Sequence, residues 1–103
     1  MNIVMLGAGN VATHLSKALQ LKGHNITQVY SKTVASAKAL AAQLNAPYTT
    51  EINDVKPTAD IYIYALKDNA LEDVIHKLDV PNAIHIHTAG SVSIDVFEDR
   101  VRY

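Results

Sequence analysis

The fold is decided by residues 2–12, which read NIVMLGAGNVA. The apolar run from Asn2 to Leu6 is typical of a buried strand. Residues 7–12 follow it directly and have the form G-x-G-x-x-A, and a helical pattern begins at Val11. A strand, a glycine-rich turn and a helix in this order are typical of the first unit of a parallel α/β sheet that binds a dinucleotide.

Each small residue of the turn has its own role in such a unit. Gly7 permits the tight turn, Gly9 lets a pyrophosphate approach the backbone without meeting a Cβ atom, and Ala12 lets the helix pack close to the strand. The N-terminus of the helix offers unpaired N–H groups and a partial positive charge to the phosphates. The motif therefore predicts a dinucleotide site. The alternative is a glycine turn that serves only tight packing.

The rest of the chain alternates apolar runs with helical patterns. Crossovers of this length favour a parallel sheet covered by helices on both faces. The right-handed crossover rule then predicts one doubly wound α/β domain with strand order 3-2-1-4-5. The expected strands are 2–6, 25–30, 48–50, 60–66 and 83–87, and the expected helices are 11–22, 33–44, 69–78 and 93–100, with one or two helical turns at 51–56 and the start of a further strand at 101–103.

The chain of 103 residues is long enough for one domain with its own core. Hydrophobic residues make up 49% of it and charged residues 18%, which is typical of a folded domain and not of a disordered one. The absence of cysteine excludes disulfides, cysteine–zinc sites and thiol catalysis. No signal peptide is visible, and the longest strongly apolar run, 61–66, is too short to span a bilayer. We therefore expect a cytoplasmic protein with no membrane partner.

The charges are distributed unevenly along the chain. The first 50 residues contain four lysines and no acidic residue, whereas residues 51–103 contain ten acidic and five basic residues. A basic first half in a nearly neutral protein favours an anionic small ligand there, and ordinary solvated lysines are the alternative. No cationic stripe or aromatic platform accompanies the lysines, so no nucleic-acid partner is expected.

The end of the second expected strand indicates which dinucleotide is bound. A site for NAD usually has Asp or Glu about 20 residues after the glycine turn, where it binds the ribose 2′-hydroxyl. Here residues 29–33 read VYSKT, and no acid precedes Glu51. Ser31 and Thr33 can donate hydroxyl hydrogen bonds to a 2′-phosphate, and Lys32 can supply positive charge. The sequence therefore favours NADP(H) over NAD(H), unless Ser31 or Thr33 only caps the next helix and Lys32 is solvated.

Four segments in order resemble the landmarks of a known family: GAGNVA (7–12), VYSKT (29–33), ADIYIYALKDNAL (59–71) and HTAGSVSIDVFED (87–99). They are similar to the N-terminal Rossmann domain of pyrroline-5-carboxylate reductases. They are most similar to a group of two-domain oxidoreductase-like proteins that pair such a domain with a helical C-terminal domain, and deazaflavin-dependent NADP reductases are further relatives. The resemblance implies that residues 1–103 form an NADP-binding Rossmann domain, the N-terminal part of a longer two-domain protein. It also implies a homodimer formed mainly through the C-terminal domain.

The resemblance further implies which residues contact the cofactor. It does not favour a role in proline synthesis, because the reductases usually have Lys-Pro after the fourth strand and Lys67 is followed here by Asp68. The implied contacts are Gly7, Gly9, Asn10 and Val11 with the pyrophosphate, Ser31, Lys32 and Thr33 with the 2′-phosphate, Ala65, Leu66 and Lys67 along the cofactor, and Thr88, Ala89 and Gly90 near the nicotinamide.

Two histidines lie two residues apart on the fifth expected strand and therefore point to the same face. His87 is at the carboxyl end, where ligands bind in open α/β sheets, so it is a candidate to bind or protonate a substrate. Alternatively, it hydrogen-bonds the backbone near the loop. We expect His85 to be a buried, hydrogen-bonded sheet residue. Tyr62 and Tyr64 are expected to be core aromatics whose hydroxyls find a partner. Because the histidines are scattered, no metal site is expected.

The sequence thus predicts the NADP(H)-binding half of an oxidoreductase that transfers hydride to or from a small-molecule substrate. The cofactor provides the chemistry, and the domain binds and orients it. The chain alone is expected to be inactive because nothing in it closes a substrate pocket. Two alternatives remain open: a non-catalytic module that binds a dinucleotide or senses redox state, and a cofactor domain reduced to a structural role.

Overall fold

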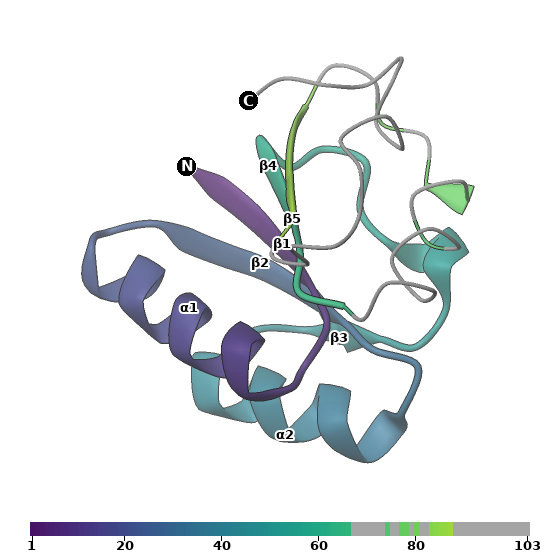
Figure 1. Cartoon of the computed structure of the whole chain (residues 1–103), viewed down its shortest axis with the longest axis horizontal. Coiled ribbons are helices and arrows are strands. Elements are labelled where there is room, and N and C mark those ends of the chain that lie inside the picture. Colours follow the sequence, from purple (N-terminus) through teal and green to yellow (C-terminus); the bar gives the residue numbers. More distant parts are fainter. Residues whose placement is uncertain (67–73, 75–76, 79, 81–82, 88–103) are drawn as a thin grey trace.

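Five parallel strands form a single sheet: β1 (Asn2–Leu6), β2 (Asn25–Tyr30), β3 (Tyr48–Thr49), β4 (Ile61–Tyr64) and β5 (Ile84–His87). The computed structural model describes residues 1–66, 74, 77, 78, 80 and 83–87. The strand order is β3-β2-β1-β4-β5, as predicted (Figure 1). In the register, Leu6 at the end of β1 lies between Tyr30 of β2 and Tyr64 of β4. The carboxyl ends of these three strands therefore meet at one edge of the sheet.

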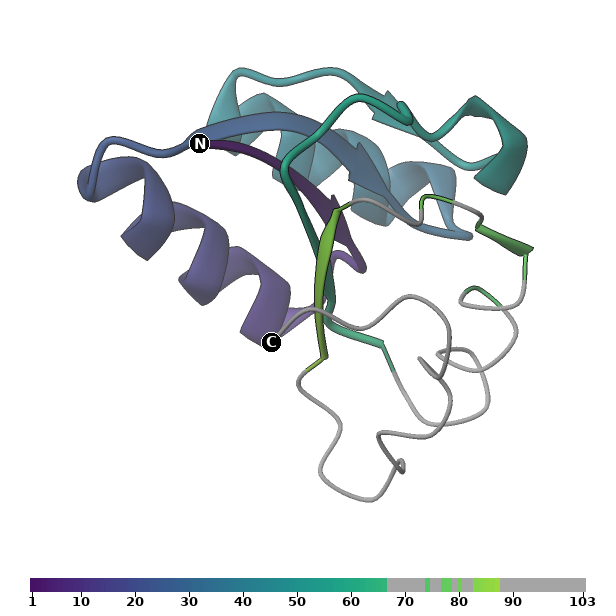
Figure 2. The ribbon, with the colours of Figure 1, turned by 90° about the horizontal axis from the view of Figure 1, so that it is seen from above.

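Two helices cover one face of the sheet, as Figures 1 and 2 show: α1 (Asn10–Leu21) and α2 (Val34–Leu44). Each begins within four residues of the strand before it, so both helix N-termini lie at the carboxyl edge of the sheet. Alternate residues of the central strands pack against the helices. The buried hydrophobic residues of this layer are Ile3, Met5, Ala12, Ile26, Val29, Leu40, Ala41, Leu44 and Ile63.

A second buried cluster lies on the opposite face of the sheet. It includes residues of the connection between β3 and β4, which contains the short 3₁₀ helix η1 (Ile52–Asp54). Its buried members are Val4, Leu6, Tyr30, Val55, Ala59, Tyr62, Tyr64, Val74, Leu78, Val80 and Ala83. Tyr62 and Tyr64 are thus core aromatics, as predicted.

Buried polar side chains fasten the connection between β3 and β4 to this face. The side-chain amide of Gln28 donates to the carbonyl of Asp54 at 3.0 Å and accepts from the Lys56 N–H at 2.8 Å. The hydroxyl of Tyr62 donates to the carbonyl of Lys56 and accepts from the Ala59 N–H at 3.3 Å. Gln28 and Tyr62 are themselves buried, so these bonds give their polar side-chain atoms partners inside the fold.

Several boundaries differ from the prediction. The first helix is one residue earlier at both ends than 11–22, and α2 begins at Val34 because Thr33 has an extended backbone. The fourth strand ends at Tyr64 instead of Leu66, and the fifth begins at Ile84 instead of Ala83. The helix expected at 93–100 and the strand start at 101–103 lie outside the described residues, as does most of the helix expected at 69–78.

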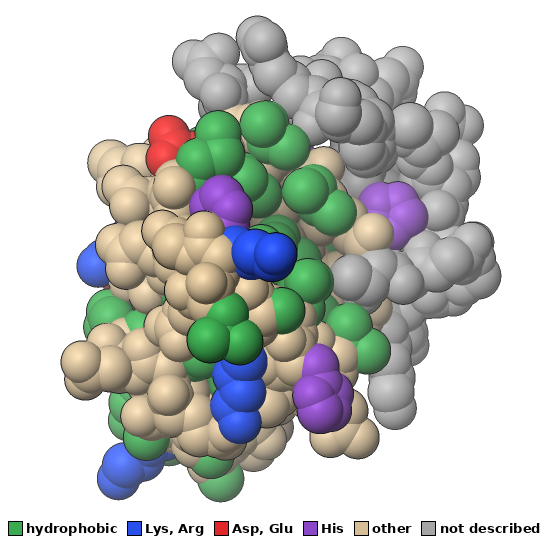
Figure 3. Space-filling model, turned by 90° about the vertical axis from the view of Figure 1, so that its left-hand side faces the viewer, with side chains coloured by type: hydrophobic (Ala, Val, Ile, Leu, Met, Phe, Trp, Pro, Cys, Tyr) green, Lys and Arg blue, Asp and Glu red, His purple; other side chains and the backbone are tan. Residues whose placement is uncertain are grey.

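Figure 3 shows the surface from the left-hand side of Figure 1. On this face the hydrophobic side chains gather near the top and the middle of the view, and basic side chains are separated by neutral ones. Val11, Leu21 and Ile86 are among the exposed large hydrophobic residues. In the part of the chain that the structure describes, no helix has the length and apolar composition needed to cross a membrane.

Candidate functional site

An open cleft of about 510 Å³ lies at the carboxyl edge of the sheet. The strand order reverses beside it, since β2 and β3 extend from one side of β1 and β4 and β5 from the other. Open α/β sheets bind ligands at such a point. The structure brings together here predicted residues from the glycine turn, from 31–33 and from 65–66. The lining residues are Gly7, Ala8, Gly9, Tyr30, Ser31, Lys32, Thr33, Ser36, Ala65, Leu66 and Val74.

Gly7 is required by the fold itself. Its φ is +118°, which side chains rarely tolerate, and its N–H donates to the carbonyl of Tyr30 at 2.7 Å. A Cβ atom on Gly7 would collide with the carbonyl oxygen of Ala65. Gly7 therefore permits the close approach of the Ala65 backbone. Its N–H is already hydrogen-bonded to Tyr30.

Gly9 is different, because nothing in the fold needs a glycine there. Its φ is −83°, which any residue adopts, and a Cβ atom would have no neighbour within 4 Å. Gly9 itself lines the cleft, so that atom would take up open space at the start of α1. Gly9 therefore leaves space beside the helix N-terminus that a phosphate can occupy and a side chain would fill.

The N-terminus of α1 faces the cleft without a side-chain cap. Among the residues that the structure describes, no side chain caps it, and its first turn contains no acidic residue. Asn10 and Val11 are exposed at its first two positions but do not line the cleft. The carbonyl of Gly9 accepts from the amide of Thr13 at 2.9 Å and from its hydroxyl at 2.8 Å, which fixes the turn. The first N–H groups of α1 are therefore oriented for an anion.

The N-terminus of α2 opens on the same cleft. The hydroxyl of Thr33 makes no capping hydrogen bond, and the first turn of α2 contains no acidic residue. The hydroxyl of Ser31 accepts from the Thr33 N–H at 3.3 Å, which shapes the connection between β2 and α2 instead of capping the helix. Capping by Ser31 or Thr33, the alternative weighed from the sequence, is therefore not what these hydroxyls do.

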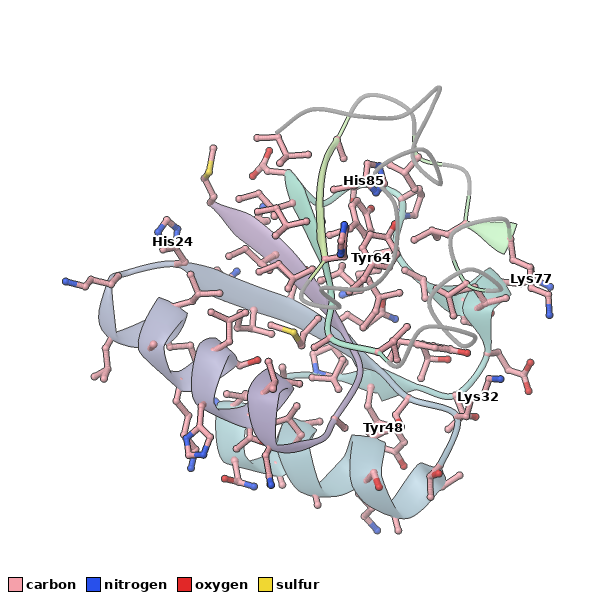
Figure 4. All side chains as sticks on the ribbon, in the orientation of Figure 1. His24, Lys32, Tyr48, Tyr64, Lys77 and His85 are labelled. Atoms are coloured by element: carbon pink, nitrogen blue, oxygen red, sulfur yellow. The ribbon has the colours of Figure 1, made fainter. Side chains whose placement is uncertain are left out.

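Lys32 supplies the positive charge at this end of the cleft. It is exposed at the β2–α2 connection, as its position in Figure 4 shows. Ser36, the third residue of α2, also lines the cleft, and it was not predicted from the sequence. Its position three residues after Thr33 could have identified it, because the third residue of a helix lies beside the first N–H groups of that helix.

The wall on the β4 side of the cleft is apolar. It consists of Ala65, Leu66 and the buried side chain of Val74. The Ala65 N–H donates to the carbonyl of Leu6 at 2.8 Å, which joins this wall to the end of β1. Val74 and Tyr30 were not predicted to line the cleft. Lys67, which the resemblance places along the cofactor, lies outside the described residues.

The two histidines of β5 differ in their surroundings. His85 is fully buried and hydrogen-bonded, as predicted. His87 is half-buried at the carboxyl end of β5, where it pairs with Tyr64 in the register, and it is not among the cleft-lining residues. Thr88, Ala89 and Gly90 lie outside the described residues. Among the described side chains, no three potential metal ligands come together.

Comparison with known proteins identifies relatives of this chain. The family model described as "NADP oxidoreductase coenzyme F420-dependent" matches residues 2–96. A structure from Bacteroides fragilis, assigned as an NADP oxidoreductase, is 45% identical over 97% of this chain, with a TM-score of 0.86. A 1-pyrroline-5-carboxylate reductase from Streptococcus pyogenes is 25% identical over 98% of the chain, with a TM-score of 0.79.

Other solved structures share the fold at lower identity. A pyrroline-5-carboxylate reductase from Coxiella burnetii is 19% identical over 96% of the chain and covered over 39% of its own length, with a TM-score of 0.82. No curated protein matches the chain. The chain spans 40% of the Bacteroides fragilis protein and 38% of the Streptococcus pyogenes reductase.

Proposed function

Because the chain belongs to the NADP oxidoreductase family described as coenzyme F420-dependent, we propose that it is the cofactor domain of an enzyme that transfers hydride between NADP(H) and a small substrate. The domain is of the Rossmann type, and NADP(H) is its cofactor. The nicotinamide supplies the hydride chemistry when the cofactor is bound. The residues of this chain bind and orient the cofactor.

The arrangement of the two helix N-termini supports this proposal most strongly. Both open on one cleft, and neither has a side-chain cap or an acidic residue in its first turn. NADP(H) differs from NAD(H) in having a second anionic group, the 2′-phosphate, besides the pyrophosphate. Two separate anion sites on one cleft fit NADP(H) better than a ligand with a single anionic group.

Each part of the cofactor then has residues of suitable chemistry. The backbone at Gly9, Asn10 and Val11 would hold the pyrophosphate, because space and unpaired N–H groups coincide there. Lys32 and the hydroxyls of Ser31, Thr33 and Ser36 would hold the 2′-phosphate. The apolar wall of Ala65, Leu66 and Val74 would accept a flat, uncharged part of the ligand.

For the substrate, the described part of this chain offers a single candidate residue. His87, at the carboxyl end of β5, is the candidate to bind or protonate a small substrate near the nicotinamide. We propose that a further domain closes the substrate pocket and forms the homodimer, since the relatives are longer than this chain. We propose a cytoplasmic location for the enzyme.

Turnover by the whole protein tests the proposal. Purified protein that includes this domain would be mixed with NADPH and a panel of small imines, ketones and aldehydes, and the loss of NADPH absorbance followed. Oxidation of NADPH that depends on one substrate class supports the oxidoreductase. Tight NADPH binding with no turnover over the whole panel favours the non-catalytic binding or sensing module. A His87→Ala protein with unchanged kcat and KM would remove His87 from the proposal.

A further inference from the structure

A hydrogen-bonded pair, Tyr64 and His85, is buried in the second core cluster (Figure 4). Their side chains are 1% and 0% exposed. The Tyr64 hydroxyl lies 2.7 Å from Nδ1 of His85, and Nε2 of His85 lies 2.7 Å from the carbonyl oxygen of Val80. The imidazole ring is also stacked near Tyr62, with the ring centres 5.5 Å apart and an interplanar angle of 18°.

The partners of the ring determine the direction of both hydrogen bonds. A carbonyl oxygen can only accept, so Nε2 of His85 donates to Val80. In the neutral ring Nδ1 then accepts, and the Tyr64 hydroxyl donates to it. The result is a one-way chain from Tyr64 through His85 to the carbonyl of Val80. A short chain of this kind fixes the distance and the angle between the segments that it joins.

Both ends of this series of hydrogen bonds are connected to the apolar wall of the cofactor cleft. At one end, Tyr64 directly precedes Ala65 and Leu66, which line the cleft. At the other end, Val80 and Leu78 share a buried cluster with Val74, and the Leu78 N–H donates to the carbonyl of Val74 at 2.9 Å. The third member of the wall, Val74, is thus tied to the same region of the core.

We propose that Tyr64 and His85 are positioning residues that hold the Ala65–Leu66 segment and Val74 at the spacing the bound cofactor needs. This role rests on the proposed function, because it concerns the wall of the same cleft. His85 is not among the residues that line the cleft. It acts through the two segments to which it is hydrogen-bonded.

Gln28 provides a matched comparison. It is also a buried polar side chain with two hydrogen bonds to backbone groups, on the same side of the sheet. Its partners are Asp54 and Lys56, which belong to the connection at η1 and do not line the cleft. Replacing Gln28 therefore removes two side-chain hydrogen bonds, as replacing His85 does, without releasing the wall.

The first test needs no ligand. The methyl signals of Leu66 and Val74 and the exchange rate of the Ala65 amide would be measured by NMR in four proteins: the unsubstituted chain, His85→Leu, His85→Gln and Gln28→Leu. In His85→Leu we expect both methyl signals to move and the Ala65 amide to exchange about tenfold faster. His85→Gln keeps a donor and an acceptor and should recover most of the original values, whereas Gln28→Leu should leave all three signals in place.

The second test measures the consequence for binding. Calorimetric titration with NADPH should show about a tenfold higher Kd for His85→Leu and for the milder variant Tyr64→Phe, and less than about a twofold change for Gln28→Leu. Titrations are made at a temperature where each variant is folded by circular dichroism. Equal effects in the His85 and Gln28 variants would mean general loosening and would overturn the proposal, as would unmoved Leu66 and Val74 signals in His85→Leu. If the unsubstituted chain does not bind NADPH, the claim that this chain by itself forms the cofactor site fails, and the ligand-free test still decides the positioning role.

Discussion

The amide nitrogen of Gly7 lies 2.7 Å from the carbonyl oxygen of Tyr30, and this hydrogen bond joins the end of β1 to the end of β2. The turn that leads into α1 and the connection that leads into α2 therefore have a fixed relationship. The two helix N-termini that face the cleft are held apart by the sheet itself and not by flexible loops. The two helix N-termini at the cleft thus have fixed positions in the fold itself, as the proposed site for two anionic groups requires.

The two glycines of the turn predict opposite phenotypes. Gly7→Ala should lower the free energy of unfolding by at least about 2 kcal/mol, because the backbone has a positive φ and the new methyl group meets Ala65. Gly9→Ala should leave stability within about 1 kcal/mol of the original, because its methyl group enters open space. Urea denaturation of both variants measures the difference.

Gly9→Ala should nevertheless weaken NADPH binding by about tenfold or more, because the methyl group occupies space beside the α1 N-terminus. Calorimetric titration of the folded variant measures this. An unchanged Kd for NADPH in a normally stable Gly9→Ala protein would contradict the proposed position of the pyrophosphate at the start of α1.

Lys32 should determine the preference between the two dinucleotides. Lys32→Ala is expected to raise the Kd of NADPH by about five- to tenfold and to leave the Kd of NADH unchanged, because only NADPH has the 2′-phosphate. The effect should shrink at high salt, since the side chain is exposed. Lys38→Ala is the matched control: Lys38 is an exposed lysine of α2 that does not line the cleft. Equal losses for NADPH and NADH would contradict the role given to Lys32.

Tyr62 should make the protein sensitive to alkali. Burial raises the pKa of the Tyr62 hydroxyl above its usual value of 10.0, and the hydrogen bond from the Ala59 N–H partly lowers it. The unfolded chain therefore loses this proton first as the pH rises. The stabilisation is complete below about pH 10, the pKa in the unfolded chain, and is lost as the pH rises through the higher pKa of the folded protein.

Unfolding free energies measured at neutral pH and above pH 10 test this. Tyr62→Phe should be less stable at neutral pH, because the hydroxyl bonds to Lys56 and Ala59 are lost, but should lose less stability with alkali than the original chain. Tyr48→Phe, at an exposed tyrosine, is the control and should lose as much unfolding free energy with alkali as the original chain. A Tyr62→Phe protein that loses as much unfolding free energy with alkali as the original chain would contradict the assignment to Tyr62.

Asn45 should show the cost of ending α2 with a left-handed residue. Its φ is +55°, and the next N–H, of Ala46, donates to the carbonyl of Ala41 at 3.0 Å. Asn45→Ala should lower the free energy of unfolding by about 1 kcal/mol, whereas Asn45→Gly should keep it or raise it slightly. Urea denaturation compares the two variants. Equal stabilities would show that the helix ends differently in solution.

The sequence was sufficient for the sheet order and for two of the strands. The runs 2–6 and 25–30 are bounded by Gly7 and by polar residues, and the structure gives the same limits. The predicted strand 60–66 was too long, because apolar residues continue past Tyr64 and a pattern cannot distinguish a strand residue from a cleft wall. Ala65 and Leu66 lie beyond the end of the strand, where they line the cleft.

Long-range packing explains what local patterns missed at the site. The positive φ of the turn already requires glycine at position 7, but the second reason, the carbonyl oxygen of Ala65 far along the chain, arises only when the folded sheet brings the two together. Val74, also far along the chain from the glycine turn, likewise reaches the cleft only in the folded structure. Ser36 lies in the first turn of α2, where a serine has several ordinary roles, and only the geometry of the cleft distinguishes among them.

Calorimetric titration of this chain with NADPH and, separately, with NADH measures whether the cleft distinguishes the two dinucleotides. We expect NADPH to bind about tenfold or more tighter than NADH, because the α1 end of the cleft would hold the pyrophosphate of both dinucleotides and the α2 end would hold only the 2′-phosphate. Equal or tighter binding of NADH would contradict the role of residues 31–33. Binding of neither dinucleotide would contradict the claim that this chain by itself forms the cofactor site.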